Sequence, residues 1–293
     1  QRGSGELYLD IELTAPEVKA SKRLPLNIGL VVDRSGSMAG QKLAHARDAA
    51  RQLVRRLRDG DRIAIITYGS DVTTLVPSTV VDSASREQIL RTINTITDRG
   101  GTFLSGVLEL ARTEVLRHGR SGRVNRVLLI SDGQANERLT RISELSALSR
   151  RTLTSGIHVT TMGVGLDFNE EVMTAMAEHG GGHYYFIQNS AAMARFFADE
   201  LDTMTSIVGK SATLRLELAP GVSLERVYGY TFTREGRTVS IALPDVYGGQ
   251  QRKIMCKLRV PTDRAGKLAV GRVRLTYDHP DAGARQRALA STG

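Results

Sequence analysis

From residue 26 to residue 206, short apolar runs alternate with segments whose apolar residues recur at helical spacing. Residues 26–32 read LNIGLVV, which is typical of a strand buried on both faces. Strands are expected at 26–32, 63–68, 72–81, 124–131, 157–164 and 183–187, with 72–81 at an edge. Helices are expected at 43–57, 86–96, 104–116, 142–151, 170–178 and 191–207. Repeated strand–helix units of this kind predict an α/β fold with a doubly wound, mostly parallel sheet covered by helices on both faces.

Both flanks of this α/β region alternate apolar and polar residues, as half-buried strands do. The alternation covers residues 7–13 before the region and residues 214–218, 239–243, 254–260 and 273–277 after it. Turn residues such as Ala219-Pro220-Gly221 separate the later runs. The pattern predicts a small antiparallel β-sandwich at 207–293, which the strand within residues 1–23 joins. The α/β domain at 24–206 is then either inserted in that β domain or followed by it.

The last third of the chain is basic. Residues 207–293 carry 15 Lys and Arg against 7 Asp and Glu, which accounts for most of the net charge of +9. Solvated strand faces explain such a bias, and so does an anionic partner. The chain has 6 Phe, 8 Tyr and no Trp, so few rings are available for stacking on bases, which disfavours nucleic acid as the partner.

Cys256 is the single cysteine, which excludes an intrachain disulfide. It lies on the apolar side of the expected strand at 254–260, so we expect a packed thiol and not a nucleophile. No apolar run approaches the roughly 20 residues of a membrane-spanning helix, so we expect no such helix.

Oxygen-bearing side chains follow the first buried strand. Asp33, Ser35 and Ser37 alternate in one tight turn, so their oxygens can converge on one point. Thr102 follows Gly100-Gly101 before an expected helix, and Asp132 follows the expected strand at 124–131. Carboxyl ends of parallel strands lie along one edge of a sheet, where doubly wound folds bind ligands. Two carboxylates and three hydroxyls there suit Mg²⁺ or a similar hard divalent cation such as Mn²⁺ or Ca²⁺.

These segments, DRSGSM, GGT and SDGQAN, resemble the metal-ion-dependent adhesion site of von Willebrand factor type A domains, whose fold is Rossmann-like. The matched elements occur in the family's order, and the resemblance covers about residues 24–206. The β flanks make the whole chain similar to bacterial calcium-activated-chloride-channel-like and inter-alpha-trypsin-inhibitor-like proteins.

The resemblance implies roles for individual residues. Ser35 and Ser37 are expected to ligate the ion directly, Thr102 to ligate it in the ligand-bound state, and Asp33 and Asp132 to act mostly through water. One coordination position is left for an acidic residue of a partner. Arg34, Gly101 and Gly133 are expected to border the bound partner.

The sequence therefore predicts a non-enzymatic, metal-dependent protein-binding module for adhesion or scaffolding, which captures an Asp or Glu of a protein partner. One alternative is a metal-dependent hydrolase, since an ion with an open position can activate water. Another is anion or nucleic-acid binding by the basic β domain. An extracytoplasmic or cell-surface location is favoured over the cytoplasm, whereas the partner and the oligomeric state are not specified by the sequence.

Overall fold

The computed structural model of the protein describes residues 3–16, 24–101, 104–119, 122–132, 142–165, 168–187, 196, 207–262, 266, 268–279 and 285–292. The chain divides into two compact units. An α/β unit comprises Leu24–Asp202, and a β unit comprises Gln1–Arg23 together with Thr203–Gly293.

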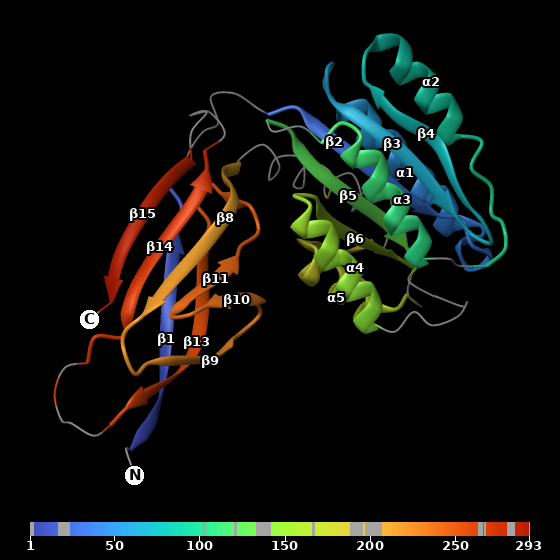
Figure 1. Ribbon diagram of the computed structural model, residues 1–293. Helices are drawn as coiled ribbons and strands as arrows, with labels where there is room; N and C mark the ends of the chain where they lie inside the picture. Colours follow the sequence, from blue (N-terminus) through green and yellow to red (C-terminus); the bar gives the residue numbers. More distant parts are fainter. Residues whose placement is uncertain are drawn as a thin grey trace. The chain divides into compact units, whose positions relative to one another are not determined.

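The α/β unit is built on a six-stranded sheet with the order β4-β3-β2-β5-β6-β7 (Figure 1). The strands are β2 (Leu26–Asp33), β3 (Arg62–Tyr68), β4 (Val72–Val80), β5 (Val124–Ser131), β6 (His158–Val164) and β7 (Gly181–Ile187). All neighbouring pairs are parallel except β3 and β4, which are antiparallel. Every residue of β2 is buried, which explains its unbroken apolar run. The strand order reverses between β2 and β5, so this pair forms the switch point of the sheet.

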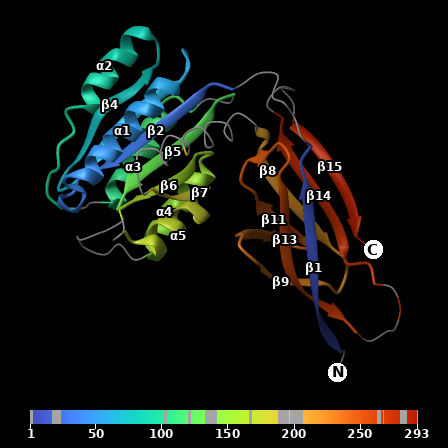
Figure 2. The same cartoon turned by 180° about the vertical axis from the view of Figure 1, so that it is seen from behind.

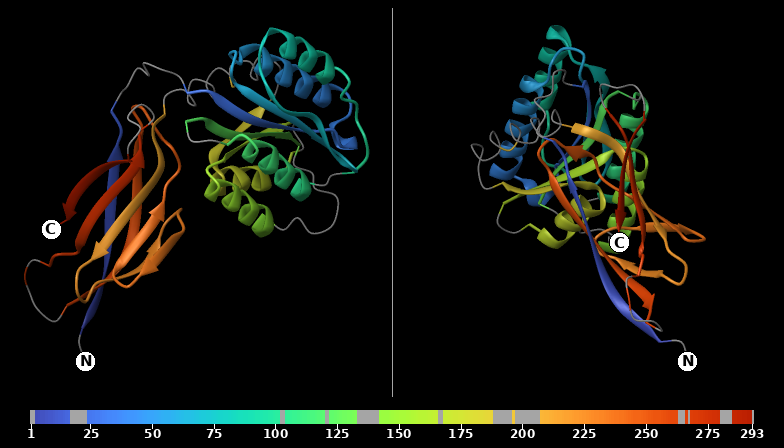
Figure 3. Two further views of the ribbon diagram at one scale, coloured as in Figure 1. Left: turned by 45° about the horizontal axis from the view of Figure 1, so that its top comes forward. Right: turned by 90° about the vertical axis from the view of Figure 1, so that its left-hand side faces the viewer.

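Helices cover both faces of this sheet, as the sequence predicts (Figures 1 and 3). They are α1 (Gln41–Arg56), α2 (Ser83–Ile93), α3 (Leu104–Leu116), α4 (Ile142–Thr154) and α5 (Glu170–His179). Side chains of α3, α4 and α5 share one core cluster with one face of the sheet, and α1 packs against α2 on the other. No helix within the described ranges is both long enough and apolar enough to span a membrane.

Helix α2 begins at Ser83, three residues before the predicted start at Arg86. The Asp82 side chain accepts a hydrogen bond from the Ser85 amide, and the Ser85 hydroxyl accepts one from the Asp82 amide. This capping box satisfies amides of the first turn with polar side chains. An apolar periodicity does not detect such a turn.

The β unit consists of two antiparallel sheets (Figure 2). One has the order β1-β13-β9, from β1 (Ser4–Thr14), β13 (Gln251–Pro261) and β9 (Ser223–Val227). The other has the order β10-β11-β8-β14-β15, with β12 beside β8, from β8 (Ile207–Leu218), β10 (Phe232–Glu235), β11 (Thr238–Ala242), β12 (Val246–Tyr247), β14 (Gly271–Asp278) and β15 (Arg285–Thr292). The two sheets share one hydrophobic core, to which Ile11, Leu214 and Ile254 contribute.

Strand β1 decides how the two units are connected along the chain. All 11 residues of β1 pair with β13, from Ser4 opposite Pro261 to Thr14 opposite Gln251. The chain therefore starts in the β unit, passes through the α/β unit and returns. The predicted fold class, a doubly wound α/β sheet with additional antiparallel sheets, is confirmed, and the α/β unit is an insertion in the β unit.

Other sequence expectations differ from the structure. Of the helix expected at 191–207, only Phe196 and Ile207 lie within the described residues, and its expected end is wrong, because Ile207 is the first residue of β8. Strands β9, β10, β12 and β15 were not predicted. All four residues of β10 are exposed, so this strand has no apolar alternation, and β12 has only two residues.

Basic residues of β13 are paired with glutamates of its neighbours. Lys257 lies 2.6 Å from Glu6 and 3.5 Å from Glu225, and Arg259 lies 2.5 Å from Glu225. Hydrogen bonding with Arg259 lowers the pKa of the Glu225 carboxyl, and hydrogen bonding with Glu6 raises the pKa of Lys257. Part of the basic charge of the last third therefore belongs to cross-strand ion pairs and is not free for an anionic partner.

We predict that the Cys256 thiol is inert in the native protein. Cys256 is fully buried in the β unit core, and burial raises its pKa to about 11. At pH 8 its reaction with iodoacetamide should be roughly 100-fold slower than in guanidinium, because the thiolate is the reactive form. Mass spectrometry of the labelled chain measures this without ambiguity, since no second cysteine is present. Equal rates in native and denaturing buffer would contradict the assignment.

Candidate functional site

Asp33 is the last residue of β2 and is fully buried. Its carboxylate accepts hydrogen bonds from the Ser35 amide at 2.8 Å, the Tyr68 hydroxyl at 2.9 Å and the Ser131 hydroxyl at 2.6 Å. Burial raises the pKa of Asp33, and the bonds from Ser131 and Ser35 oppose this rise. Burial raises the pKa of Tyr68 as well, so its hydroxyl stays protonated and donates. The fold thus holds Asp33 in place, although removing its charge from water is unfavourable.

The two serines of the turn lie close together. Ser35 is buried, and its Oγ lies 3.1 Å from the Oγ of Ser37. Two ligands at adjacent corners of an octahedron around Mg²⁺ are about 3 Å apart, because each metal–oxygen bond is about 2.1 Å long. Ser37 lies within a short 3-10 turn, Gly36–Met38, which directly follows Ser35, and Met38 of this turn is buried. The two hydroxyls are hydrogen-bonded to one another, and their spacing is also compatible with adjacent ligands of one ion.

Asp132 follows β5, the strand beside β2, and is fully buried. Its carboxylate lies 3.1 Å from the Nζ of Lys42, which belongs to the first turn of α1. Its backbone carbonyl accepts a hydrogen bond of 2.9 Å from the Asn169 amide, just before α5. Parallel pairing of β2 with β5 places Asp33 and Asp132 at the same carboxyl edge of the sheet.

The glycine loop before α3 is bonded to the turn that carries the serines. The Gly36 amide donates to the Gly100 carbonyl at 2.7 Å, and the Gly101 amide donates to the Ser70 hydroxyl at 2.7 Å. A Cβ at Gly100 would lie 1.8 Å from the Ser70 Oγ, and Gly100 has a φ of +64°. Close approach and backbone conformation both require glycine here. The loop leading to Thr102 is thereby fixed beside the serine turn, whereas Thr102 itself and Gly133 lie outside the described residues.

The donor set at this edge fits a hard divalent cation. Two fully buried carboxylates and a close pair of hydroxyls lie along this edge, and a cation beside the carboxylates would offset their desolvation. Within the described ranges no three His, Cys, Asp or Glu side chains gather in a metal-binding cluster. A site of two carboxylates and several hydroxyls does not require such a cluster. The candidate ligands are oxygens, a set that would suit Mg²⁺, Mn²⁺ or Ca²⁺ better than zinc.

Comparison with known families identifies the α/β unit. The model of the von Willebrand factor type A domain matches residues 27–199, which is more than half of the chain. The chain belongs to this family. The matched segment includes every described residue of the candidate metal site at the carboxyl edge of the sheet, from Asp33 to Asp132.

Relatives and solved structures extend the likeness beyond the type A domain. An uncharacterized protein of Synechocystis sp. is 28% identical over 96% of this chain and 68% of its own length. Inter-alpha-trypsin inhibitor heavy chain H4 of Bos taurus is 26% identical over 63% of this chain, which covers 21% of that protein. The structure of a von Willebrand factor type A protein from Catenulispora acidiphila superposes with a TM-score of 0.81 at 17% identity, covering 99% of this chain and 69% of that chain. The last comparison shows that both units have a known precedent as a fold.

Three residues at or beside the candidate metal site were not identified by the sequence analysis. Tyr68 is the last residue of β3 and Ser131 the last of β5, and both donate to Asp33. Their places at the ends of strands beside β2 are the pattern that could have identified them. No such pattern identifies Lys42, because a lysine near the start of a helix is usually exposed and its sequence context does not tell the two cases apart.

The residues predicted to border a partner are placed only in part. The Arg34 guanidinium bonds the Asp71 carboxylate at 2.8 Å, and only 12% of the Arg34 side chain is exposed. Gly101 is described and half-buried, in the loop bonded to Ser70. Contact of Arg34, Gly101 and Gly133 with a partner stays a prediction.

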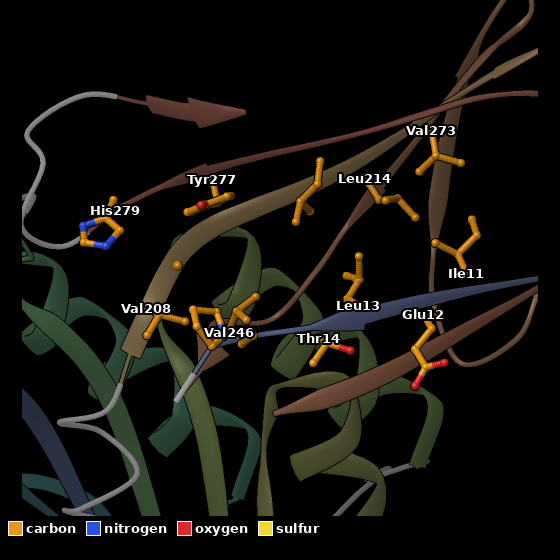
Figure 4. A pocket seen from close by; sticks show the side chains of 14 residues that line it. Ile11, Glu12, Leu13, Thr14, Val208, Leu214, Val246, Val273, Tyr277 and His279 are labelled. Atoms are coloured by element: carbon orange, nitrogen blue, oxygen red, sulfur yellow. The ribbon is translucent and has the colours of Figure 1, made fainter. Parts of the chain in front are cut away.

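The β unit contains a separate pocket of about 400 Å³. Its lining includes aliphatic side chains of β1, β8 and β14, with Tyr277 and His279 at one end and Ile11 and Val273 at the other (Figure 4). No residue of the candidate metal site lines it. The pocket is therefore separate from the candidate metal site and contributes none of the predicted ligands.

We predict that Tyr68→Phe destabilises the α/β unit. The Tyr68 hydroxyl donates to the buried Asp33 carboxylate and lies 2.8 Å from the Ser131 Oγ, so its loss should lower the free energy of unfolding by about 1–3 kcal/mol. Urea unfolding followed by helical circular dichroism in a chelating buffer measures the change, because the described helices all belong to this unit.

Tyr184→Phe is the matched control for this substitution. The Tyr184 hydroxyl is buried without a hydrogen-bond partner among the described residues. Its removal should leave the free energy of unfolding unchanged or slightly raise it. Equal destabilisation by the two substitutions would show that the bonds of Tyr68 are not important.

Proposed function

We propose that this chain is a divalent-metal-dependent protein-binding module, which captures a carboxylate of its partner through an ion at the carboxyl edge of the α/β sheet. The observation that carries the proposal is the convergence of Asp33, Ser35 and Ser37 after β2. Its neighbour in the sheet, β5, leads directly into Asp132. Membership of the von Willebrand factor type A family supports it, because such domains serve as adhesion and interaction modules.

The contacts of the described residues support the proposed roles. Ser35 and Ser37 supply two neutral oxygens at the spacing of adjacent ligands, and Thr102 is proposed as a third. Asp33 is held by three donors, so its carboxylate has a fixed orientation toward the turn. When bound, the ion supplies a positive centre whose neutral ligands leave its charge available to an incoming anion. A carboxylate of a protein partner suits that position.

The chain covers only a fifth of the length of the inhibitor heavy chain that it resembles, at 21%. The identity of the partner, a role in adhesion or scaffolding and an extracytoplasmic location are therefore proposed for this chain and not transferred from its relatives. We propose no catalytic activity. Both carboxylates at the site are proposed to hold the ion, which leaves neither of them to act as a general base.

We predict that Mg²⁺ binding depends on the serine turn. Asp33→Asn and Ser35→Ala should each weaken Mg²⁺ binding by about tenfold or more in calorimetric titrations, since one removes an orienting charge and the other a ligand. Asp59→Asn is the matched control. Its side chain is 73% exposed, pairs with Arg86 and precedes β3, at the amino edge of the sheet. Unchanged affinity in both site variants would refute the assignment of the site.

We predict that the bound ion accepts an external carboxylate. Mn²⁺ is the probe, because water bound to this paramagnetic ion speeds the relaxation of bulk water protons. Glutarate should reduce the relaxation enhancement of the Mn²⁺-loaded protein by displacing bound water, and an uncharged diol of equal length should not. No response to glutarate at saturating metal would show that the ion has no position open to an acidic partner.

A further inference from the structure

Lys42 faces the candidate metal site from α1. Its Nζ lies 3.1 Å from the Oδ2 of Asp132, whose side chain is fully buried, and 22% of the lysine side chain is exposed. This contact joins a positive charge of the chain to a carboxylate that is expected to serve the ion. The Asp132 carboxylate would then interact with two cations, the ammonium of Lys42 and the bound ion.

The position of Lys42 at the amino end of α1 does not favour helix formation. Lys42 is the second residue of α1, and the first turn contains no acidic residue. The amino end of a helix carries partial positive charge, so a lysine there is disfavoured by the helix itself. Pairing with Asp132 supplies the compensating interaction.

The fold also makes room for this side chain. Gly165 follows β6 and has a φ of +88°. A Cβ at this position would lie 2.4 Å from the Cε and 3.2 Å from the Nζ of Lys42. Glycine thus leaves the space through which the lysine stem passes on its way to Asp132, so the lysine is seated by a second element of the sheet edge.

We propose that Lys42 is a built-in counter-ion of Asp132, which holds the metal-free site together and competes with the divalent cation. The proposal rests on the metal site put forward above. Without metal, the ammonium compensates the buried charge of Asp132. With metal, it repels the ion, so the affinity for Mg²⁺ is set below what the oxygen ligands alone would give.

A charge count shows what this arrangement would achieve. A divalent cation balances Asp33 and Asp132, and Lys42 then leaves one positive charge in excess at the loaded site. That excess favours an anionic ligand over water at the open position. Lys42 thereby lowers the affinity for the metal ion and strengthens the attraction of the loaded site for a partner's carboxylate.

The test compares Lys42→Met, Lys42→Arg and Arg55→Met with the wild type in calorimetric Mg²⁺ titrations at fixed ionic strength. Lys42→Met keeps the stem and removes the charge, so it should tighten Mg²⁺ binding on the order of tenfold. Lys42→Arg keeps the charge and should stay within about threefold of the wild type. Arg55→Met removes the same charge from an exposed position about 20 Å further along α1 and should have no effect.

Thermal unfolding separates this role from a merely structural one. Lys42→Met should lower the midpoint of the metal-free protein and increase the rise that saturating Mg²⁺ produces. A lysine that only packs would lower the midpoint with and without metal, and Mg²⁺ affinity would not improve. Equal or weaker Mg²⁺ binding by Lys42→Met would overturn the inference.

The outcomes also distinguish this inference from the proposed function. If the wild type binds Mg²⁺ and Lys42→Met binds it no more tightly, only the role of Lys42 is wrong. If neither protein binds Mg²⁺ or Mn²⁺, the metal site and the competition are both wrong. Binding by Lys42→Met alone would support the competition in its strongest form.

Discussion

The burial of two carboxylates at the carboxyl ends of neighbouring strands is the constraint on which the candidate site depends. Asp33 and Asp132 are both fully buried, and a carboxylate in that position is unfavourable unless donors or cations compensate its charge. The chain compensates Asp33 with an amide and two hydroxyls, and Asp132 with the ammonium of Lys42. These contacts come from several elements, so the site is a product of the whole sheet edge.

The same constraint accounts for the residues around the serine turn. Tyr68 and Ser131 end the strands on either side of β2, which is why their hydroxyls reach Asp33. Gly69 and Gly100 allow two loops to pass in close contact, since a Cβ at Gly69 would lie 2.0 Å from the Arg99 carbonyl oxygen. The loops are thus tied to one another by backbone hydrogen bonds before any ligand is considered. Such support is what a site needs if its oxygens are to stay convergent.

The β unit has a different physical basis. Its two sheets bury a common core, and in one of them β1 pairs with β13, more than 200 residues further along the chain. In the sequence, the α/β unit therefore lies between two segments that pair with one another in the β unit. Charged residues on β13 find partners on the neighbouring strands, and the excess of basic residues is in part a property of this sheet.

The sequence by itself determined the α/β class, because unbroken apolar runs and helical spacing reflect burial that any parallel sheet imposes. It also pointed to Asp33, Ser35, Ser37 and Asp132, since oxygen side chains after buried strands are visible as a local pattern. Only the tertiary structure brought Tyr68, Ser131 and Lys42 to these carboxylates, because their contacts join residues 35 to 98 positions apart in the chain. It alone showed that β1 pairs with β13, and it revealed β10, whose exposed residues carry no apolar pattern. Local burial leaves a mark in the sequence, whereas the choice of a distant partner depends on how the strands are ordered in space.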